Sequence, residues 1–454
     1  MPTTNRPTLS RRGFLGASAA TAVALPMFVP SRAFGANERI TMGVIGVGKM
    51  ASGHLDYFAG RKDVQVLAVS DVEQSRLDAA QKMATDKNAK LGRTGAKVDA
   101  YAQYEELLGR KDIDAVVIGS PDHWHTAMLI RACQAGKDIY CEKPLTLTIE
   151  ESQLCIEAVR RYKRVMQTGS QQRSEMAEGR ADLPHLKGVS RFRAAAEYIR
   201  NGKLGKIREI HVKIGQTSKP CDLPEETLAP GLDWDRWLGQ APKRPFNSML
   251  CRRGLPNSYP FNPGWRDYRE YSGGHVTDWG AHHFDIVQWA LGMDGSGPSI
   301  FMPPTGGGPS FSKGGASFIY PTTPVGDNVL VKHMTDGNGI YFLGEKGSLW
   351  VNRGELKTDP AEVLAQPLAS SDTRLEDSGG NHRQNWVDCI KSRKDPICRV
   401  EVGAGSVTVC HLVNLCYWHG EKLEWDPKTW SFKNPAHNAW KSREQRAPYT
   451  LPKV

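Results

Sequence analysis

The chain has 454 residues, of which 39% are hydrophobic, enough for a buried core and about two or three domains. Its formal charge is +10, but four arginines precede the first acidic residue, so the remainder carries only about +6. No run of Lys and Arg is dense enough to predict a nucleic-acid partner. The nine cysteines form no CxxC pair or Cys/His cluster of the kind that binds a metal.

The first 35 residues have the parts of a twin-arginine export signal. Arg11 and Arg12 end a basic segment, an apolar, Ala-rich stretch runs from about 15 to 29, and Ala33-Phe34-Gly35 supplies small residues for a signal peptidase. The apolar stretch is shorter than the roughly 20 residues that span a bilayer, and we expect no later segment to be long and apolar enough. We expect cleavage after Gly35, export to the periplasm and no membrane association afterwards; a buried N-terminal helix is the alternative.

From residue 39 apolar strands alternate with helices. Strands are expected at 40–45, 64–70, 115–119, 138–141 and 165–168, and helices at 51–58, 76–84, 126–135 and 149–162. The polar residues 86–100 look like a loop insertion. Strands joined by crossover helices predict an α/β domain with a doubly wound parallel sheet, a Rossmann domain over 36–170.

A glycine-rich turn stands between the first strand and the first helix. In Gly46-x-Gly48-x-x-Ala51, Gly46 permits the tight turn, Gly48 lets the backbone approach a pyrophosphate, and the phosphates sit on the helix N-terminus with Lys49 and Met50. Asp71 ends the second strand, where a carboxylate accepts hydrogen bonds from ribose hydroxyls and repels a 2′-phosphate. These residues predict NAD as the cofactor. A helix-capping role for Asp71 is the alternative, and the nearby Arg76 leaves NADP as the other candidate cofactor.

Two more loops follow strands of this sheet, and ligands bind beyond the carboxyl ends of such strands. We expect the cofactor to be lined by Ser120, Pro121, His123, His125, Glu142 and Lys143. The Lys143 ammonium, on a backbone stiffened by Pro144, can polarise a substrate hydroxyl or carbonyl. The alternative is a solvated surface lysine.

A predicted amphipathic helix over 276–291 places Asp278, His282 and Asp285 on one face by their i, i+4 and i+7 spacing. His282 can shuttle a proton, and a carboxylate one turn away can fix its tautomer. We predict Lys143, His282 and Asp278 as catalytic residues. A structural helix-face histidine is one alternative, and a zinc site of His275, Asp278 and His282 is a less favoured one, so we expect no metal.

The pattern changes after about residue 170. We expect a second, α+β domain over 171–454 with a large, mainly antiparallel open sheet, and the sequence leaves open that its C-terminal segment packs back on the first domain. The expected strands are 207–215, 328–333, 339–343 and 347–352, and the expected helices are 190–201, 381–392 and 403–420. Residues 216–274 are too long for a plain connection and predict a functional insertion.

Together, these motifs resemble the glucose–fructose oxidoreductase / inositol dehydrogenase (Gfo/Idh/MocA) family. The resemblance rests on the 46–51 turn, Asp71, Pro121–His125, Glu142-Lys143-Pro144 and Asp278-x-Gly280-x-His282-x-x-Asp285. It implies that Lys143 and His282 lie at the substrate, that His282 shuttles the proton, and that Asp278 contacts the substrate or His282. It also implies sugar-like substrates and dimer contacts through the open sheet, so we expect a homo-oligomer, a dimer or tetramer.

The insertion departs from the simplest members of this family. It carries Trp234, Trp237, Trp265 and Arg266, and it resembles exported relatives from polysaccharide-degrading bacteria. The tryptophans could form a sugar subsite or pack against the sheet.

The sequence thus predicts an NAD-dependent oxidoreductase that transfers hydride between a nicotinamide cofactor and a sugar or glycoside hydroxyl. One alternative is an NAD-dependent glycosidase that works by transient oxidation and elimination. A further alternative is an exported sugar-binding protein without turnover, although the intact Lys143/His282 pair disfavours it.

Overall fold

The computed structural model describes residues 39–93, 97–174, 183–228, 230–252, 254, 264–304 and 315–454. The predicted export signal and its cleavage site lie outside the described residues. Residues 39–454 form one compact unit.

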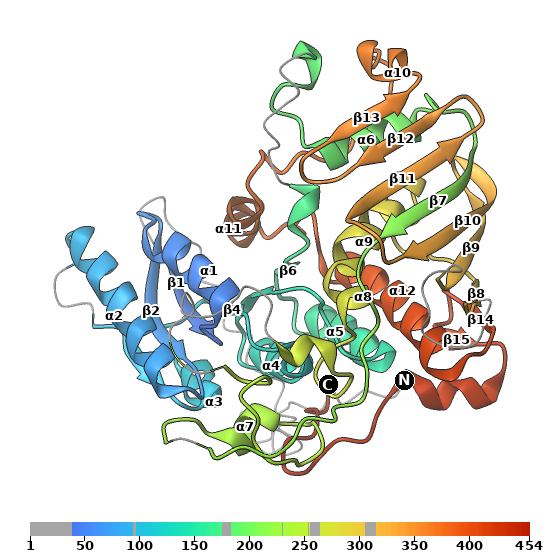
Figure 1. Ribbon diagram of the computed structural model, residues 1–454. Coiled ribbons are helices and arrows are strands. Elements are labelled where there is room, and N and C mark those ends of the chain that lie inside the picture. Colours follow the sequence, from blue (N-terminus) through green and yellow to red (C-terminus); the bar gives the residue numbers. More distant parts are fainter. Residues whose placement is uncertain are drawn as a thin grey trace, which may run out of the picture. The chain divides into compact units, whose positions relative to one another are not determined.

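The N-terminal sheet is fully parallel, as the strand–helix alternation predicts. Its six strands run in the order β3-β2-β1-β4-β5-β6, so the strand order reverses between β1 and β4 (Figure 1). Such a reversal opens a ligand-binding crevice at the carboxyl ends of the strands. The strands are β1 (Ile40–Ile45), β2 (Val64–Ser70), β3 (Asp99–Tyr101), β4 (Ala115–Ile118), β5 (Asp138–Cys141) and β6 (Met166–Thr168).

Helices cover both faces of this sheet, because its strands are apolar on both sides. In β4, Val116 and Ile118 pack into one hydrophobic cluster, and Ala115 and Val117 pack into another. The helices between the strands are α1 (Lys49–Ala59), α2 (Gln74–Lys90), α3 (Tyr104–Gly109), α4 (His125–Gln134) and α5 (Ile149–Arg161).

The loop expected at 86–100 is wrong at both ends, since α2 continues to Lys90 and β3 begins at Asp99. The last turns of α2 are polar, but Ala84 and Asn88, four residues apart, are buried on one side. The Asn88 side chain donates a hydrogen bond of 3.1 Å to the Val66 carbonyl in β2. The last turns of the helix therefore make a polar contact with the sheet that the composition does not reveal.

The second sheet has nine strands in the order β13-β12-β11-β7-β10-β9-β8-β14-β15. Only β7 and β10 pair in parallel, and the other neighbours are antiparallel, so the predicted fold class is confirmed (Figure 1). The strands are β7 (Ile207–Lys213), β8 (Ile300–Met302), β9 (Ser317–Thr323), β10 (Gly326–Met334), β11 (Gly339–Gly344), β12 (Ser348–Val351), β13 (Leu356–Asp359), β14 (Leu423–Asp426) and β15 (Ser431–Phe432).

The hydrophobic core next to this sheet includes residues of the helices α6 (Arg191–Arg200), α9 (Gly280–Leu291) and α12 (Val400–His419). By length and composition α12 could cross a membrane, which contradicts the expectation that no later segment is long and apolar enough. However, 83% of its most apolar window is buried inside the protein. Its apolar residues are therefore explained as core.

Later parts of the chain return to the first domain. Trp386 and Ile390 of α11 (His382–Ser392) belong to the hydrophobic cluster that covers β1 and β2. Tyr449 and Leu451 pack against the cluster on the other face, and the Gln134 side chain donates a hydrogen bond of 2.8 Å to the Lys453 carbonyl. The short helix α10 (Glu362–Ala365) follows β13.

The segment 216–274 has a small aromatic core of its own and attaches to the first domain. Trp234 and Trp237 of α7 (Trp234–Leu238) stack at 4.7 Å, so these two rings pack against each other. The backbone N–H of Gln74 donates to the Gly231 carbonyl at 2.8 Å, and the backbone N–H of Asp233 donates to the Val72 carbonyl at 3.0 Å. The insertion is thereby fixed beside the carboxyl end of β2.

Candidate active site

The glycine turn is held against the loop that follows β4. Gly46 has a φ of +74°, and a Cβ atom there would lie 2.6 Å from the Ser120 amide nitrogen, so only glycine fits without displacement. Gly48 precedes the first residue of α1, and a Cβ atom there would meet no described atom within 4 Å. Open space in front of a helix N-terminus is what a phosphate group requires.

Asp71 stabilises this turn directly. One carboxylate oxygen accepts a hydrogen bond of 2.8 Å from the Val47 amide, and the other accepts one of 2.9 Å from the Glu73 amide. Burial raises the pKa of Asp71, opposed by the charge of Arg76 and by these hydrogen bonds. The Arg76 guanidinium donates to the backbone carbonyls of Arg252 and Gly254 in the insertion.

The loop after β4 contributes Ser120, Pro121 and His125 to the cavity wall. The two ring nitrogens of His125 lie 3.0 Å from the Ser120 carbonyl and 2.8 Å from the Pro144 carbonyl, so His125 ties two cavity loops together. His123, expected at the cofactor, does not line the cavity. A ring nitrogen of His123 lies 2.9 Å from the Trp237 carbonyl, and the ring contacts the Trp237 ring, because the insertion packs against this side of the short turn.

Glu142 is buried at the end of β5 and lines the cavity. Burial would raise the pKa of Glu142, but a 2.7 Å contact with the His54 ring outweighs it and lowers the pKa. A Cβ atom on Gly169 would lie 2.8 Å from the Glu142 carboxylate, so the packing around this carboxylate is tight. His54, on α1, was not singled out from the sequence because its partner is 88 residues away.

Lys143 and Asp278 come together from the two domains. The Lys143 ammonium forms an ion pair with the Asp278 carboxylate and donates to the Asp278 carbonyl at 3.2 Å. The Arg266 Nε atom also lies 3.1 Å from an Asp278 carboxylate oxygen, at ion-pair distance. Burial alone would raise the pKa of Asp278, but these two cations hold it well below its usual range. The Lys143–Pro144 peptide bond is cis.

His282 lies in the first turn of α9 and lines the cavity, with 6% of its surface exposed. Among the described residues its Nδ1 atom has no hydrogen-bond partner. Burial, and then the charges of Lys143 and Arg353, lower the pKa of His282 well below its usual value. The imidazole is therefore neutral at neutral pH and in the form that accepts a proton.

The structure differs from the helix expected over 276–291 in two respects. The helix is divided into α8 (His275–Asp278) and α9, and every residue of α9 is buried, so it is not amphipathic. Asp285 does not line the cavity with Asp278 and His282. It accepts two hydrogen bonds of 2.8 Å from the buried Arg173 guanidinium and one of 2.7 Å from Ser406, so its role is structural.

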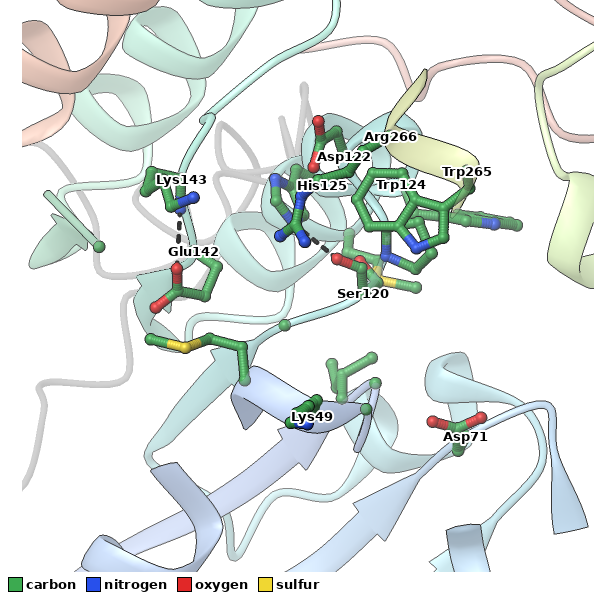
Figure 2. A pocket seen from close by; sticks show the side chains of 18 of the residues that line it. Lys49, Asp71, Ser120, Asp122, Trp124, His125, Glu142, Lys143, Trp265 and Arg266 are labelled. Carbon is green, nitrogen blue, oxygen red and sulfur yellow. Dashed lines mark hydrogen bonds between the residues drawn. The ribbon is translucent and has the colours of Figure 1, made fainter. Parts of the chain in front are cut away.

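The remaining predicted residues meet in one cavity of about 350 Å³. Figure 2 shows Lys49 and Asp71 on the side of the N-terminal strands, with Asp122 and Arg266 across the cavity from them. The predicted residues in its lining are Gly46, Gly48, Lys49, Met50, Asp71, Ser120, Pro121, His125, Glu142, Lys143, Asp278 and His282. Within the described residues, no three His, Cys, Asp or Glu side chains are placed to hold a metal ion, and this includes His275, Asp278 and His282.

Several lining residues were missed or left undecided from the sequence. Trp265 and Arg266 line the cavity, and Arg353 reaches it from the turn after β12. Asp122 is 1% exposed, lines the cavity and accepts a hydrogen bond of 2.6 Å from the Ser272 hydroxyl. Only the folded chain brings these side chains together, since they come from three distant segments.

Two family models match this chain. One, described as "Oxidoreductase family, NAD-binding Rossmann fold", matches residues 40–170, and the other, "Oxidoreductase family, C-terminal alpha/beta domain", matches residues 210–451. The chain belongs to the Gfo/Idh/MocA oxidoreductase family. Its first domain is thus an NAD-binding Rossmann domain. The open space at Gly48 and the carboxylate at Asp71 fit a dinucleotide.

The curated proteins that are similar to this chain include two types of enzyme. A "Glycosyl hydrolase family 109 protein" of Shewanella pealeana is 31% identical over 28% of this chain and 27% of its own length. An "Inositol 2-dehydrogenase" of Salmonella paratyphi B is 28% identical over 43% of this chain and 53% of its own length. The chain therefore spans about a quarter of the first relative and about half of the second.

Among solved structures, the WlbA dehydrogenase from Bordetella pertussis, in complex with NADH and UDP-GlcNAcA, has a TM-score of 0.55. The two chains are 16% identical, and the match covers 85% of this chain and 98% of that one. At this identity the likeness supports the shared two-domain Gfo/Idh/MocA fold.

Proposed function

We propose that this Gfo/Idh/MocA protein is an NAD-dependent oxidoreductase that transfers hydride between the cofactor and a sugar or glycoside hydroxyl. One observation carries the proposal. The glycine turn and Asp71 share a single cavity with Lys143, Asp278 and His282. A dinucleotide held by the first group and a hydroxyl held by the second would occupy adjoining parts of the same space.

The residues of the second group supply what the oxidation of an alcohol requires. When bound, NAD accepts the hydride from carbon. His282, neutral and without a hydrogen-bond partner on Nδ1 among the described residues, accepts the hydroxyl proton. Lys143 stabilises the negative charge that develops on the substrate oxygen. Asp278, firmly ionised, fixes the Lys143 ammonium at the cavity wall.

NAD is favoured over NADP by the charge near the end of β2. The Asp71 carboxylate disfavours a 2′-phosphate, and Arg76, the nearby cation, already donates to two carbonyls of the insertion. Both features make the site less favourable for the 2′-phosphate of NADP.

The second candidate function is glycoside cleavage through transient oxidation. It is favoured by the name of the family 109 relative, a glycosyl hydrolase. Oxidation of one carbon acidifies the neighbouring C–H bond, which permits elimination of the glycosidic oxygen. Water then adds across the new C=C bond, and return of the hydride to the oxidised carbon makes the net reaction a hydrolysis.

We further propose that the protein is exported in folded form through the twin-arginine pathway with its cofactor bound, and that it functions in the periplasm as a dimer or tetramer. Replacement of Arg11 and Arg12 by lysine should retain the protein in the cytoplasm, as measured by cell fractionation. Equal periplasmic amounts of both forms would exclude this route.

The experiment that tests the function is a substrate panel on the purified protein. Neutral and acidic sugars, and their alkyl and nitrophenyl glycosides, are added one at a time while nicotinamide absorbance and products are followed. An oxidised sugar with net cofactor reduction supports the dehydrogenase, and a free aglycone without net reduction supports the glycosidase. If no sugar changes the cofactor or is changed itself, the enzymatic proposal fails.

A further inference from the structure

We infer that Asp122 is a second proton-transfer residue in this cavity, an acid that protonates the oxygen of a substrate C–O bond as that bond breaks. The inference rests on the proposed function, because it requires a sugar bound beside Lys143 and His282. It extends that function toward bond cleavage, since oxidation of a hydroxyl requires one proton acceptor and no acid.

The two aspartates of the cavity have opposite surroundings. Asp278 lies against the Lys143 and Arg266 cations. In the described part of the chain, Asp122 has no cation within ion-pair distance, and its side chain makes one hydrogen bond, from Ser272. A buried carboxylate without a cation is costly, so Asp122 favours its protonated form.

Electrostatics point the same way. Burial raises the pKa of Asp122 to about 7, opposed by Arg266, Ser272 and Lys143 and assisted by the negative charge of Asp278. Two carboxyl groups whose environments separate their pKa values can stand in different protonation states at one pH. Near neutral pH, Asp278 is an ionised carboxylate, whereas a substantial fraction of Asp122 carries a proton that it can donate.

The position of Asp122 suits a donor to the substrate. Its side chain lines the cavity on the wall that also carries Arg266, across from Lys49 and Asp71 (Figure 2). Arg266 is near enough to act on the charge of Asp122, so it would stabilise the carboxylate that remains after proton donation. In the proposed function His282 takes the proton of the hydroxyl that is oxidised, so Asp122 is a separate proton donor in the same cavity.

The step that this arrangement supports is an elimination next to an oxidised carbon. The neighbouring C–H bond gives its electron pair to a new C=C bond and its proton to water. The C–O bond breaks with its electron pair on oxygen, and that oxygen takes the proton of Asp122. The Asp122 carboxylate then recovers a proton from the solvent, so the step needs no further reagent.

Leaving-group dependence tests the inference. A nitrophenyl group departs without protonation, whereas an alkyl alkoxide does not. With the holoenzyme, Asp122→Asn should lower aglycone release from alkyl glycosides by roughly 10²–10⁴-fold and from nitrophenyl glycosides by less than about tenfold. Asp267→Asn, a carboxylate-to-amide change at an exposed residue outside the cavity lining, should leave both rates unchanged.

Two further readouts separate this inference from the proposed function. Asp122→Asn should retain NADH affinity and the single-turnover reduction of bound cofactor by sugar. The wild-type rate on alkyl glycosides should fall above about pH 7, and this limb should be absent in the variant.

Four results would overturn the role of Asp122 while leaving the oxidoreductase intact. They are equal losses on both classes of glycoside, no loss on either, unaltered pH profiles, and cofactor reduction without aglycone release in the wild type. Absence of cofactor reduction by any sugar would overturn the proposed function itself, and the inference with it.

Discussion

Replacing Gly46 or Gly48 by alanine separates two roles of the glycine turn. At Gly46 the backbone has a φ of +74°, and the new Cβ would lie 2.6 Å from the Ser120 amide nitrogen. The left-handed conformation costs about 1–2 kcal/mol for a non-glycine residue, and the forced backbone shift adds about 1–3 kcal/mol. Gly46→Ala should therefore lower the free energy of unfolding by about 2–5 kcal/mol and also weaken dinucleotide binding.

Gly48→Ala should behave differently. The backbone there has a φ of −66°, and the added Cβ meets no described atom. The free energy of unfolding should stay within about 0.5 kcal/mol of wild type. NADH affinity should fall at least about tenfold, or about 1.4 kcal/mol, because the methyl group occupies the space of the pyrophosphate.

The assay uses protein stripped of dinucleotide. Denaturant unfolding gives the stability of each variant, and fluorescence titration with NADH gives the dissociation constant. Wild-type NADH affinity in Gly48→Ala would show that the pyrophosphate does not approach this turn. Wild-type stability in Gly46→Ala would refute the steric argument at Ser120.

Asp71→Ala should weaken NAD binding by about 1.5–3 kcal/mol and relax discrimination against NADP; an unchanged ratio of the two dissociation constants would show that Asp71 only holds the turn. His282→Ala should lower turnover roughly 10²–10⁴-fold with unaltered NADH affinity, and Lys143→Ala should cause a similar loss, less than additive with the first; wild-type turnover at saturating substrate would refute either assignment. Asp122→Asn should grow more stable relative to wild type as the pH rises from 5 to 7, by up to about 1.4 kcal/mol per unit. The reason is that the folded-state pKa of Asp122 is raised to about 7, so wild type loses stability as the pH rises toward and through this value. A difference in the free energy of unfolding between the two proteins that does not change with pH would contradict this.

Five of the six strands of the N-terminal sheet could be predicted from the sequence because burial on both faces leaves apolar runs, as in β4. The edge strand β3 could not, because its three residues are only partly buried and include a charged one, Asp99. The glycine turn was equally visible, since its spacing follows from local backbone requirements at Gly46 and Gly48. Both signals are contained within a few neighbouring residues.

Features set by distant partners were not predictable in this way. The last turns of α2 contact distant residues, as Asn88 contacts β2, and the structural role of Asp285 depends on Arg173, 112 residues away. His123 was misplaced because a six-residue loop motif does not reveal which side chains face the insertion. The roles of Arg266 and Asp122 follow from their electrostatic interactions with each other and with Asp278, which only the folded chain brings together.

The most direct test of the central claim is the redox state of the dinucleotide in the purified protein. The protein is denatured, the supernatant is analysed for NAD and NADP, and a second sample is first mixed with the best sugar of the panel. We predict close to one NAD per chain, converted to NADH by the sugar in the wild type but not in His282→Ala. A protein that contains no dinucleotide and binds neither added NAD nor NADP would contradict the account.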